Sequence, residues 1–287
     1  MAFTATRNGA ERNARSRRDA GLAARLARST LFWRLASIAI VAGLWEIAGQ
    51  IPINWAFPPF SRVAVAFAGL VFDGSLPLAY LDTIQPLAIG VVISAVLGVA
   101  LGVAMGLRED VAWAATPLFV VMQAAPMAAL IPMITFIYGI GLTSKVLAVC
   151  MLAMPVIVLN AYKAVRNVSP SLIAMSRSFL GSKRQEIVKI VLPDASPMIF
   201  AGLRLGVAAG FIGIVLAELL ITPTGIGDLI TYYRSVAKYP QMYATIASII
   251  IFAAVVVGLL LRLETALFRP EGRSPAHMKP EPIRTEP

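Results

Sequence analysis

Long apolar stretches separated by short polar segments dominate the pattern along this chain. Six of the stretches are near or above twenty residues long and contain almost no charged side chains. A helix of that length crosses roughly 30 Å of hydrocarbon. The pattern therefore predicts six transmembrane helices, at about 31–50, 84–106, 113–137, 145–163, 198–221 and 244–263.

Strands are excluded as spanning elements, because the apolar stretches do not alternate with polar residues as the strands of a membrane barrel must. The composition agrees, with 58% hydrophobic residues and only 14% charged ones, against about a quarter charged in soluble domains. We therefore expect an all-α protein that crosses a membrane several times.

The distribution of Lys and Arg predicts the orientation. Nineteen of these residues lie in the two tails, near position 108 and between the fourth and fifth spans. Only Arg62, Arg234 and Lys238 lie in the loops on the other side, and Lys145 is ambiguous at a span end. Loops rich in Lys and Arg stay on the cytoplasmic side, so both termini are predicted to be cytoplasmic.

Three regions follow from this pattern. Residues 1–30 form a basic tail and residues 269–287 a Pro-rich, charged tail, and both are expected to be disordered because they bury too little apolar surface. Residues 31–268 form the transmembrane domain, with a cytoplasmic loop at 164–197. The net charge of +10 lies between and outside the apolar stretches, which favours topology and attraction to anionic lipid over nucleic-acid binding.

Two spans carry rows of small residues. In the second span the row has a period of four and comprises Gly90, Ser94, Gly98, Gly102 and Gly106; in the fifth span it comprises Gly202, Gly206 and Gly210. Such rows let helix backbones approach closely in lipid. The third span contains Pro117, Pro126 and Pro132, which predict bends.

Few polar side chains lie within the spans, and these are the candidates for a translocation pathway. Arg34 and Arg204 are near enough to the cytoplasmic ends to extend toward water. Glu46 and Glu218 lie toward the outer ends of their helices, where water is near. For Glu218 a structural hydrogen bond is favoured over a place on the translocation route. The pathway candidates are Gln123, Thr135, Asn160 and Glu218.

The loop at 164–197 has the spacing of two short amphipathic helices. SLIAMSRSF follows Pro170, a break is expected at Gly181, and RQEIVKIVL is expected to end at Pro193. Apolar faces without a partner in their own chain usually mark an interface, so we interpret the loop as a docking element. A helix lying on the lipid surface is the alternative.

Several kinds of chemistry are excluded. The one cysteine, Cys150, cannot form an internal disulfide, and the one histidine, His277, lies in a tail, so neither a histidine metal site nor a His-based triad can form. No Gly-x-x-x-x-Gly-Lys-Ser/Thr motif is present, so ATP hydrolysis by that route needs a partner. We expect no enzyme activity, no metal and no cofactor.

The chain from about residue 40 to 268 resembles the membrane subunits of bacterial binding-protein-dependent ABC importers, most closely the sulfonate, taurine and nitrate branch. Three stretches carry the resemblance, namely APMAALIPMITFIYGIGLTSKV, SPSLIAMSRSFLGSKRQEIVKIVLPDASPMIFAGLRLG and AELLITPTGIGDLI. The second is similar to the signature loop of the family and the third to its Glu and Gly-x-Gly segment.

The loop departs from the family pattern, which begins with Glu-Ala-Ala and has a glycine six positions after that Glu. Here Ala174 stands at the Glu position and Leu180 at the glycine position, with the glycine displaced to Gly181. The missing Glu puts particular contacts with an ATPase in doubt.

The resemblance implies a complex of two permease copies, two cytoplasmic ATPases and a periplasmic binding protein. Segment 172–184 would be the coupling helix that docks on the ATPase. The residues expected to contribute to that coupling are Leu172, Ile173, Ala174, Arg177, Phe179, Gly181, Lys183 and Pro193.

The implied solute is a small organic anion such as a sulfonate, or nitrate, and a pyrimidine precursor of thiamine is the alternative. A secondary carrier driven by an ion gradient is a different class of hypothesis. It would need inverted repeats or an ion site at the middle of the membrane, and the sequence contains neither in recognisable form.

Overall fold

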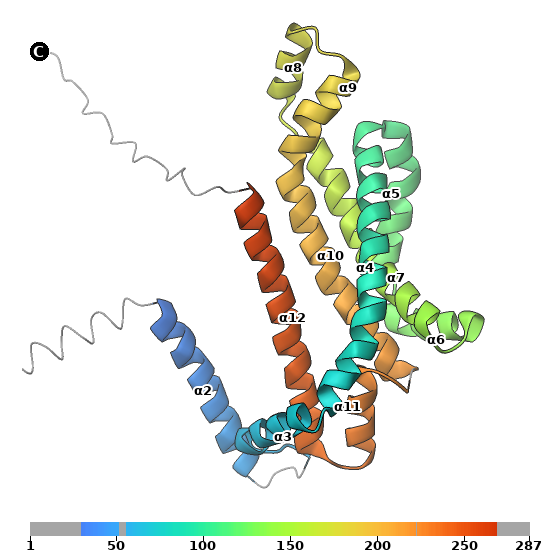
Figure 1. Ribbon diagram of the computed structural model, residues 1–287. Helices are drawn as coiled ribbons and strands as arrows, with labels where there is room; N and C mark the ends of the chain where they lie inside the picture. The colour runs from blue at the N-terminus through green and yellow to red at the C-terminus, as the bar shows by residue number, and fades with distance from the viewer. Residues whose placement is uncertain (1–29, 52–55, 222, 269–287) are drawn as a thin grey trace, which may run out of the picture. The chain divides into compact units, whose positions relative to one another are not determined.

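The computed structural model describes residues 30–51, 56–221 and 223–268, in which helices are the only regular secondary structure (Figure 1). The chain divides into two compact units, with the boundary at Ala68. Five of the described helices are long and apolar enough to span a membrane, and a bent pair of helices brings the number to six. The predicted all-helical membrane fold is confirmed.

The N-terminal unit contains α2 (Thr30–Gln50) and the first part of α3 (Phe60–Phe72). The Glu46 carboxylate accepts hydrogen bonds from the backbone N–H of Ser61 at 2.8 Å and from its hydroxyl at 3.0 Å. Glu46 therefore satisfies a free N–H in the first turn of α3. The sequence pattern did not predict α3.

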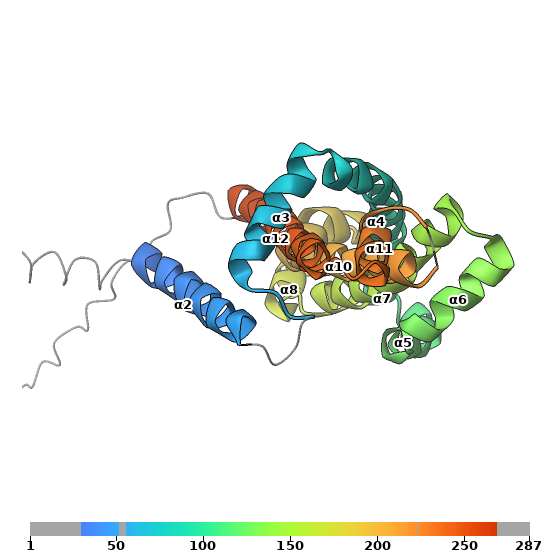
Figure 2. The same ribbon diagram turned by 90° about the horizontal axis from the view of Figure 1, so that it is seen from below.

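The second unit contains the other helices. They are α4 (Ser75–Leu107), α5 (Glu109–Ala124), α6 (Met127–Tyr138), α7 (Leu142–Arg166), α8 (Pro170–Ser178), α9 (Lys183–Glu186), the π-helical turn η1 (Ile187–Val191), α10 (Leu192–Leu220), α11 (Ile226–Ser235) and α12 (Tyr239–Phe268). Seen along the bundle, α7 and α10 lie between α12 on one side and α5 and α6 on the other (Figure 2). The sequence pattern did not predict α11 either.

Both predicted glycine rows face α7. On α4, a Cβ at Gly98 would meet Ile157 at 2.9 Å, and on α10 a Cβ at Gly202 would meet Asn160 Cβ at 2.6 Å. The other glycines of the two rows meet α7 in the same way. Because lipid tails are as apolar as the helices, close backbone packing of this kind is a main source of helix association in membranes. The predicted role in helix packing is confirmed.

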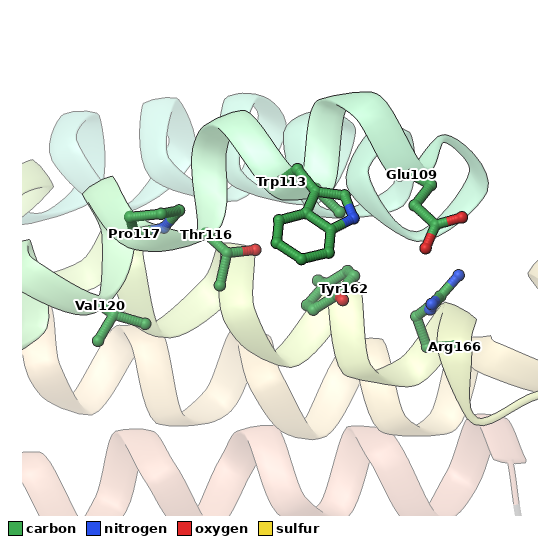
Figure 3. A pocket seen from close by; sticks show the side chains of 8 residues that line it. Glu109, Trp113, Thr116, Pro117, Val120, Tyr162 and Arg166 are labelled. Carbon is green, nitrogen blue, oxygen red and sulfur yellow. The ribbon is translucent and has the colours of Figure 1, made fainter.

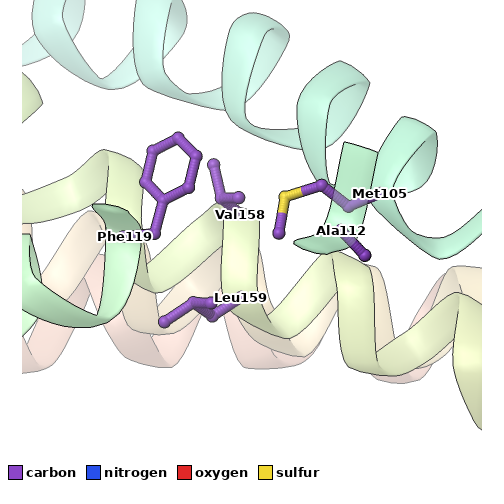
Figure 4. Close-up of a cluster of buried hydrophobic side chains, with 5 residues drawn as sticks. All are labelled: Met105, Ala112, Phe119, Val158 and Leu159. Carbon is purple, nitrogen blue, oxygen red and sulfur yellow. The ribbon is translucent and has the colours of Figure 1, made fainter. Parts of the chain in front are cut away.

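A second contact between α4, α5 and α7 fills the space beside these rows. Met105 and Val158 are fully buried, and Ala112, Phe119 and Leu159 pack with them (Figure 4). Large side chains therefore fill the space between α4, α5 and α7 on this side of the bundle, beside the glycine row. The cluster holds the α4–α5 turn against the middle of α7.

The third span, expected at 113–137, is sharply bent, as its prolines predicted. Helix α5 ends at Ala124, α6 begins at Met127, and the two directions differ by 106°. Pro126 lies at the break, where its missing N–H removes a helical hydrogen bond. Pro117 and Pro132 lie inside α5 and α6, so only one of the three prolines breaks the span.

The prediction that the second loop helix ends at Pro193 is wrong. Helices α9, η1 and α10 run on as a single helix from Lys183 to Leu220. In η1 the N–H of Leu192 bonds to the carbonyl of Ile187, five residues back. A π turn of this kind is wider than an α turn, which gives the Pro193 ring room beside the preceding turn and lets the helix continue.

Candidate functional site

A hairpin of two short helices projects from one end of the bundle (Figure 1). It comprises residues 170–186 and is called the α8–α9 hairpin below. Helix α9 is stabilised at its start by a capping box, in which the Ser182 hydroxyl and the Gln185 side chain each bond the other's backbone N–H. Arg177 on α8 forms an ion pair with Glu186 on α9 at 3.3 Å, which joins the two arms.

The turn of the hairpin presents two large apolar side chains to its surroundings. Phe179 is 81% exposed and Leu180 is 93% exposed. Leu180 has a φ of 56°, the left-handed region that favours glycine over residues with a Cβ. Leu180, at the position where the resemblance implies a glycine, is therefore strained. Gly181 instead allows a close approach, because a Cβ there would meet the Ser176 hydroxyl at 2.7 Å.

Seven of the eight predicted coupling residues divide into two groups in the structure, and Gly181 lies in the connection between α8 and α9. Ile173 packs against the base of the hairpin beside the buried cluster that includes Val168 and Val191, and Leu172 is half-buried. The outward group is Ala174, Arg177, Phe179, Lys183 and Pro193, and Met175 and Leu180 lie outward with it. The single apolar face expected on SLIAMSRSF is thus split, with one part anchoring the hairpin and the other exposed.

The helix that carries the hairpin is longer than the hydrocarbon core of a membrane is thick. The helix from Lys183 to Leu220 has 38 residues, or about 57 Å at the helical rise of about 1.5 Å per residue. A hydrocarbon core of roughly 30 Å cannot enclose a helix of that length unless it is steeply tilted. In Figure 1 the start of this helix extends past the neighbouring ends of α4, α5 and α12.

The opposite end of the bundle holds a buried ion pair. Lys145 Nζ on α7 lies 2.8 Å from Glu218 Oε1 on α10, and the two side chains are 5% and 0% exposed. The Glu218 carboxylate also accepts from the backbone N–H of Gly227 at 3.1 Å and from the Thr83 hydroxyl at 2.9–3.0 Å. A buried charge is tolerated only with such partners.

The remaining bonds of this network tie the connection after α10 into the bundle. Lys145 Nζ donates to the carbonyl of Thr224 at 3.1 Å and lies 3.0 Å from its hydroxyl. The Thr83 hydroxyl accepts from the N–H of Ile226 at 3.0 Å. Helices α4, α7, α10 and α11 are therefore joined through one ion pair, called the Lys145–Glu218 network below.

The network also explains the Gly-x-Gly of this segment. Gly225 has a φ of 94°, and a Cβ there would overlap the Glu218 carboxylate; a Cβ on Gly227 would meet Glu218 Cβ at 2.5 Å. Both positions require glycine because the backbone of the connection lies directly on the buried carboxylate. The Glu and the two glycines form one structural unit.

The four candidate pathway residues do not gather at one place. The Glu218 carboxylate is occupied by the network, as the structural interpretation expects. Asn160 donates to the carbonyl of Val156 at 2.7 Å and packs on Gly202, and the Thr135 hydroxyl bonds the carbonyl of Ile131 at 3.2 Å. A pathway role for these residues and for Gln123 stays a prediction.

Two partners were missed from the sequence. Arg204 pairs with Glu264 on α12 at 2.8 Å, with side chains 23% and 21% exposed, instead of extending to water. Lys145 is the partner of Glu218, 73 residues away along the chain. The only sequence signal for Lys145 was its place in the Ser-Lys pair that follows FIYGIGLT.

A sequence profile of the binding-protein-dependent transport system inner membrane components matches residues 94–271. The chain belongs to this family. It is a multi-pass permease subunit of a binding-protein-dependent ABC importer of the bacterial inner membrane, as the resemblance of its loop and Gly-x-Gly segment predicted.

Three relatives illustrate the range of the family. A putative aliphatic sulfonates transport permease of Bacillus subtilis is 27% identical over 76% of this chain and 78% of its own length. The riboflavin transport permease of Chloroflexus aurantiacus is 34% identical over 52% of this chain and 57% of its own length. The taurine transport permease of Escherichia coli is 28% identical over 51% of this chain and 52% of its own length.

Solved structures agree on the fold. The MetNI methionine ABC transporter, in an inward-facing conformation, superimposes with a TM-score of 0.55 and 17% identity over 67% of this chain and 94% of that chain. An amino acid ABC transporter superimposes with a TM-score of 0.53 and is 14% identical in sequence. The sulfonate, taurine and nitrate branch named from the sequence is supported by the relatives.

Proposed function

We propose that the α8–α9 hairpin of this permease is the binding site for a separate ATPase, which drives import of a small organic anion of the sulfonate type. The observation that carries the proposal is the apolar tip of the hairpin, Phe179 and Leu180, at 81% and 93% exposure. An apolar tip outside the membrane needs a partner to cover it.

The charge around the tip indicates the chemistry of that partner. Arg177, Lys183 and Arg184 are exposed beside it, and the position of the family's Glu is Ala174. A cleft that accepts this hairpin should therefore be apolar at its base and acidic at its rim, because like charges opposite the three basic residues would be costly.

A protein partner explains the hairpin better than a lipid surface. A helix that lies on lipid runs in the membrane plane with its apolar face buried. Helix α8 instead runs alongside the start of the long α9–α10 helix (Figure 1), and the largest apolar side chains lie at its far end. In this arrangement the tip points away from the membrane, and the orientation expected from Lys and Arg makes that side cytoplasmic.

The long helix offers a direct mechanical link. A force on the hairpin reaches the interior of the bundle without a flexible joint, since α9, η1 and α10 are continuous. The base of the hairpin is held by the buried cluster of Val165, Val191 and Ala195. Movement of the ATPases would thus be transmitted to α10 and to the pore between two permease copies.

The test is co-purification of the ATPase encoded beside the permease gene with tagged permease variants. Phe179→Ser and Lys183→Glu should each reduce the bound ATPase at least several-fold, because they remove the apolar tip and reverse the rim charge. Lys238→Glu, a charge reversal at the opposite end of the bundle, is the matched control. Undiminished ATPase in both hairpin variants would refute the docking proposal.

Arg177 needs a more careful design because it also pairs with Glu186. Arg177→Glu alone would loosen the hairpin and reverse its surface charge at once. The double variant Arg177→Glu/Glu186→Arg keeps the internal ion pair with its ends exchanged. We expect it to fold like the parent and still to bind the ATPase more weakly, which separates docking from hairpin stability.

The proposed solute rests on relatives. Those named for aliphatic sulfonates, taurine and nitrate match over 76%, 51% and 67% of this chain. The second candidate is a pyrimidine, because the formylaminopyrimidine permease of Halalkalibacterium halodurans matches over 78% of this chain and 90% of its own length at 25% identity. Calorimetric titration of the associated binding protein with taurine, an alkanesulfonate, nitrate and a formylaminopyrimidine decides between them.

A further inference from the structure

A crevice of about 420 Å³ lies between α5 and α7, at the end of the bundle that carries the α8–α9 hairpin. Its lining runs from Glu109 and Arg166 at one end, past Trp113 and Tyr162, to Thr116 and Val120 (Figure 3). On α5 these residues recur every three or four positions, so they form one helix face.

The polarity of the crevice changes with depth in the membrane. Glu109 begins α5 and Arg166 ends α7, so the two charges lie at the level where both helices leave the membrane. Trp113 and Tyr162 are each one turn further in, and Val120 is about three turns in. A bilayer leaflet has the same order of polarity. Its charged groups lie at the surface, aromatic side chains lie below them, and apolar groups lie deepest.

The two charges are free to bind something else. Within the part of the chain that the structure describes, neither Glu109 nor Arg166 forms an ion pair or a side-chain hydrogen bond. Figure 3 shows both side chains on the same end of the crevice. Trp113 is 77% exposed and stands beside them, although a side chain of this size is usually buried or placed at the membrane–water interface.

We propose that this crevice binds a zwitterionic phospholipid with a primary ammonium group, of the phosphatidylethanolamine type. Arg166 pairs with the phosphate, and Glu109 accepts from the ammonium. Trp113 and Tyr162 lie at the glycerol level, and the upper acyl chain follows Thr116 and Val120 inward. The site is independent of the transported solute and requires only that α5 and α7 lie in the membrane.

Charge complementarity favours this headgroup over the alternatives. A phosphatidylcholine head has a phosphate but no N–H for Glu109. A phosphatidylglycerol head offers neutral hydroxyls and no cation to that carboxylate, and its phosphate is a second negative charge close by. An ionic hydrogen bond at a partly exposed site contributes about 1 kcal/mol, so we expect about a fivefold preference for the ethanolamine lipid over the choline lipid.

The experiment uses Trp113 as the reporter. In a full-length variant with Trp33, Trp45 and Trp55 changed to Phe, the protein is placed in phosphatidylcholine nanodiscs with a minor fraction of one brominated lipid, which quenches nearby tryptophan. The brominated lipid carries an ethanolamine, choline or glycerol head. Quenching should be strongest for the ethanolamine lipid. Native mass spectrometry of the partly delipidated wild-type chain measures the same preference without removing any tryptophan.

The variants Glu109→Gln and Arg166→Gln should abolish the preference. Asp110→Asn and Lys163→Gln are the matched controls, since each removes an exposed charge next to a lining residue without touching the crevice; both should keep it. Equal quenching by all three lipids overturns the proposal, as does a preference that survives both lining variants.

A second permease copy is the main competing occupant. In a Cys150→Ala background, Thr116→Cys would then cross-link between two copies in the membrane, and Trp113 would be shielded from every brominated lipid. That combination also overturns the proposal. Cross-linking without a loss of quenching is not expected, since one crevice cannot hold a lipid and a helix of the partner together.

Discussion

Removal of the Lys145 ammonium is the perturbation with the largest expected effect on stability. In Lys145→Met the side chain keeps its approximate length, but three contacts of the ammonium group disappear, to Glu218 Oε1 and to the carbonyl and hydroxyl of Thr224. Glu218 keeps only the Gly227 N–H and the Thr83 hydroxyl. A fully buried carboxylate then remains without a counterion.

The magnitude follows from that burial. Removing one partner of a buried ion pair lowers the free energy of unfolding by about 3–5 kcal/mol. Most of this loss comes from the unpaired charge that stays buried. Removing both charges in Lys145→Met/Glu218→Gln should therefore cost less than the sum of the two single variants, because residues of one network are not additive. Lys163→Met, on the exposed side of α7, is the matched control and should change stability by less than about 0.5 kcal/mol.

The assay is the free energy of unfolding of the purified permease in mixed micelles of mild detergent and SDS, followed by circular dichroism. We expect Lys145→Met to unfold at a clearly lower SDS fraction than the parent and the Lys163→Met control. Equal stability of Lys145→Met and the control would refute the inference that the Lys145–Glu218 network joins the four helices. Strict additivity in the double variant would refute the coupling between the two residues.

Three further predictions concern the hairpin, the second ion pair and the Gly-x-Gly segment. Leu180→Gly should raise the free energy of unfolding by about 0.5–1 kcal/mol, because glycine relieves the strain of the left-handed backbone. It should also weaken ATPase binding. The control Ala237→Gly, at the same φ of 56°, should raise the free energy of unfolding without affecting ATPase binding. Reversing Arg204 alone should destabilise by about 1 kcal/mol, and exchange with Glu264 should restore stability in the same micelle assay. Gly225→Ala should lower stability by about 1–3 kcal/mol through the clash with the network, and an unchanged unfolding curve would contradict that account.

The helices that cross the membrane were predictable because their signal is local and repeated. A stretch of about twenty apolar residues has one viable conformation in lipid, since each backbone N–H must be satisfied within the segment. The glycine rows were equally informative: their period of four predicted a packed face on α4 and on α10, and α7 lies against both. The shorter helices α3 and α11 gave no such signal, because neither is long enough to span.

The break of the third span shows where local patterns fail. Three prolines predicted a bend somewhere in 113–137, but a proline can also sit inside a helix when neighbours satisfy the freed carbonyl. Pro117 and Pro132 do so, and only Pro126 lies at the break. At Pro193 the π turn before it relieves the ring, and hydrophobic patterns contain no signal for a one-residue change in hydrogen-bond register.

The candidate site was predicted in outline and not in its contacts. The pattern of the loop predicted two helices and a turn, and Phe179 and Lys183 are exposed as a docking surface requires. The strained Leu180 was visible only as a departure from the family's glycine. Lys145 was missed because its partner Glu218 comes from another helix, and a pairing over such a distance depends on how helices pack rather than on either local sequence.

The most direct test of the account is a photo-crosslink from the tip of the hairpin. Replacing Phe179 with p-benzoyl-phenylalanine in the assembled transporter should, on illumination, give a covalent product with the ATP-binding subunit. The same residue in place of Val236, at the opposite end of the bundle, should not. A product with lipid alone, or with a protein on the binding-protein side, would contradict the claim that an ATPase binds the α8–α9 hairpin.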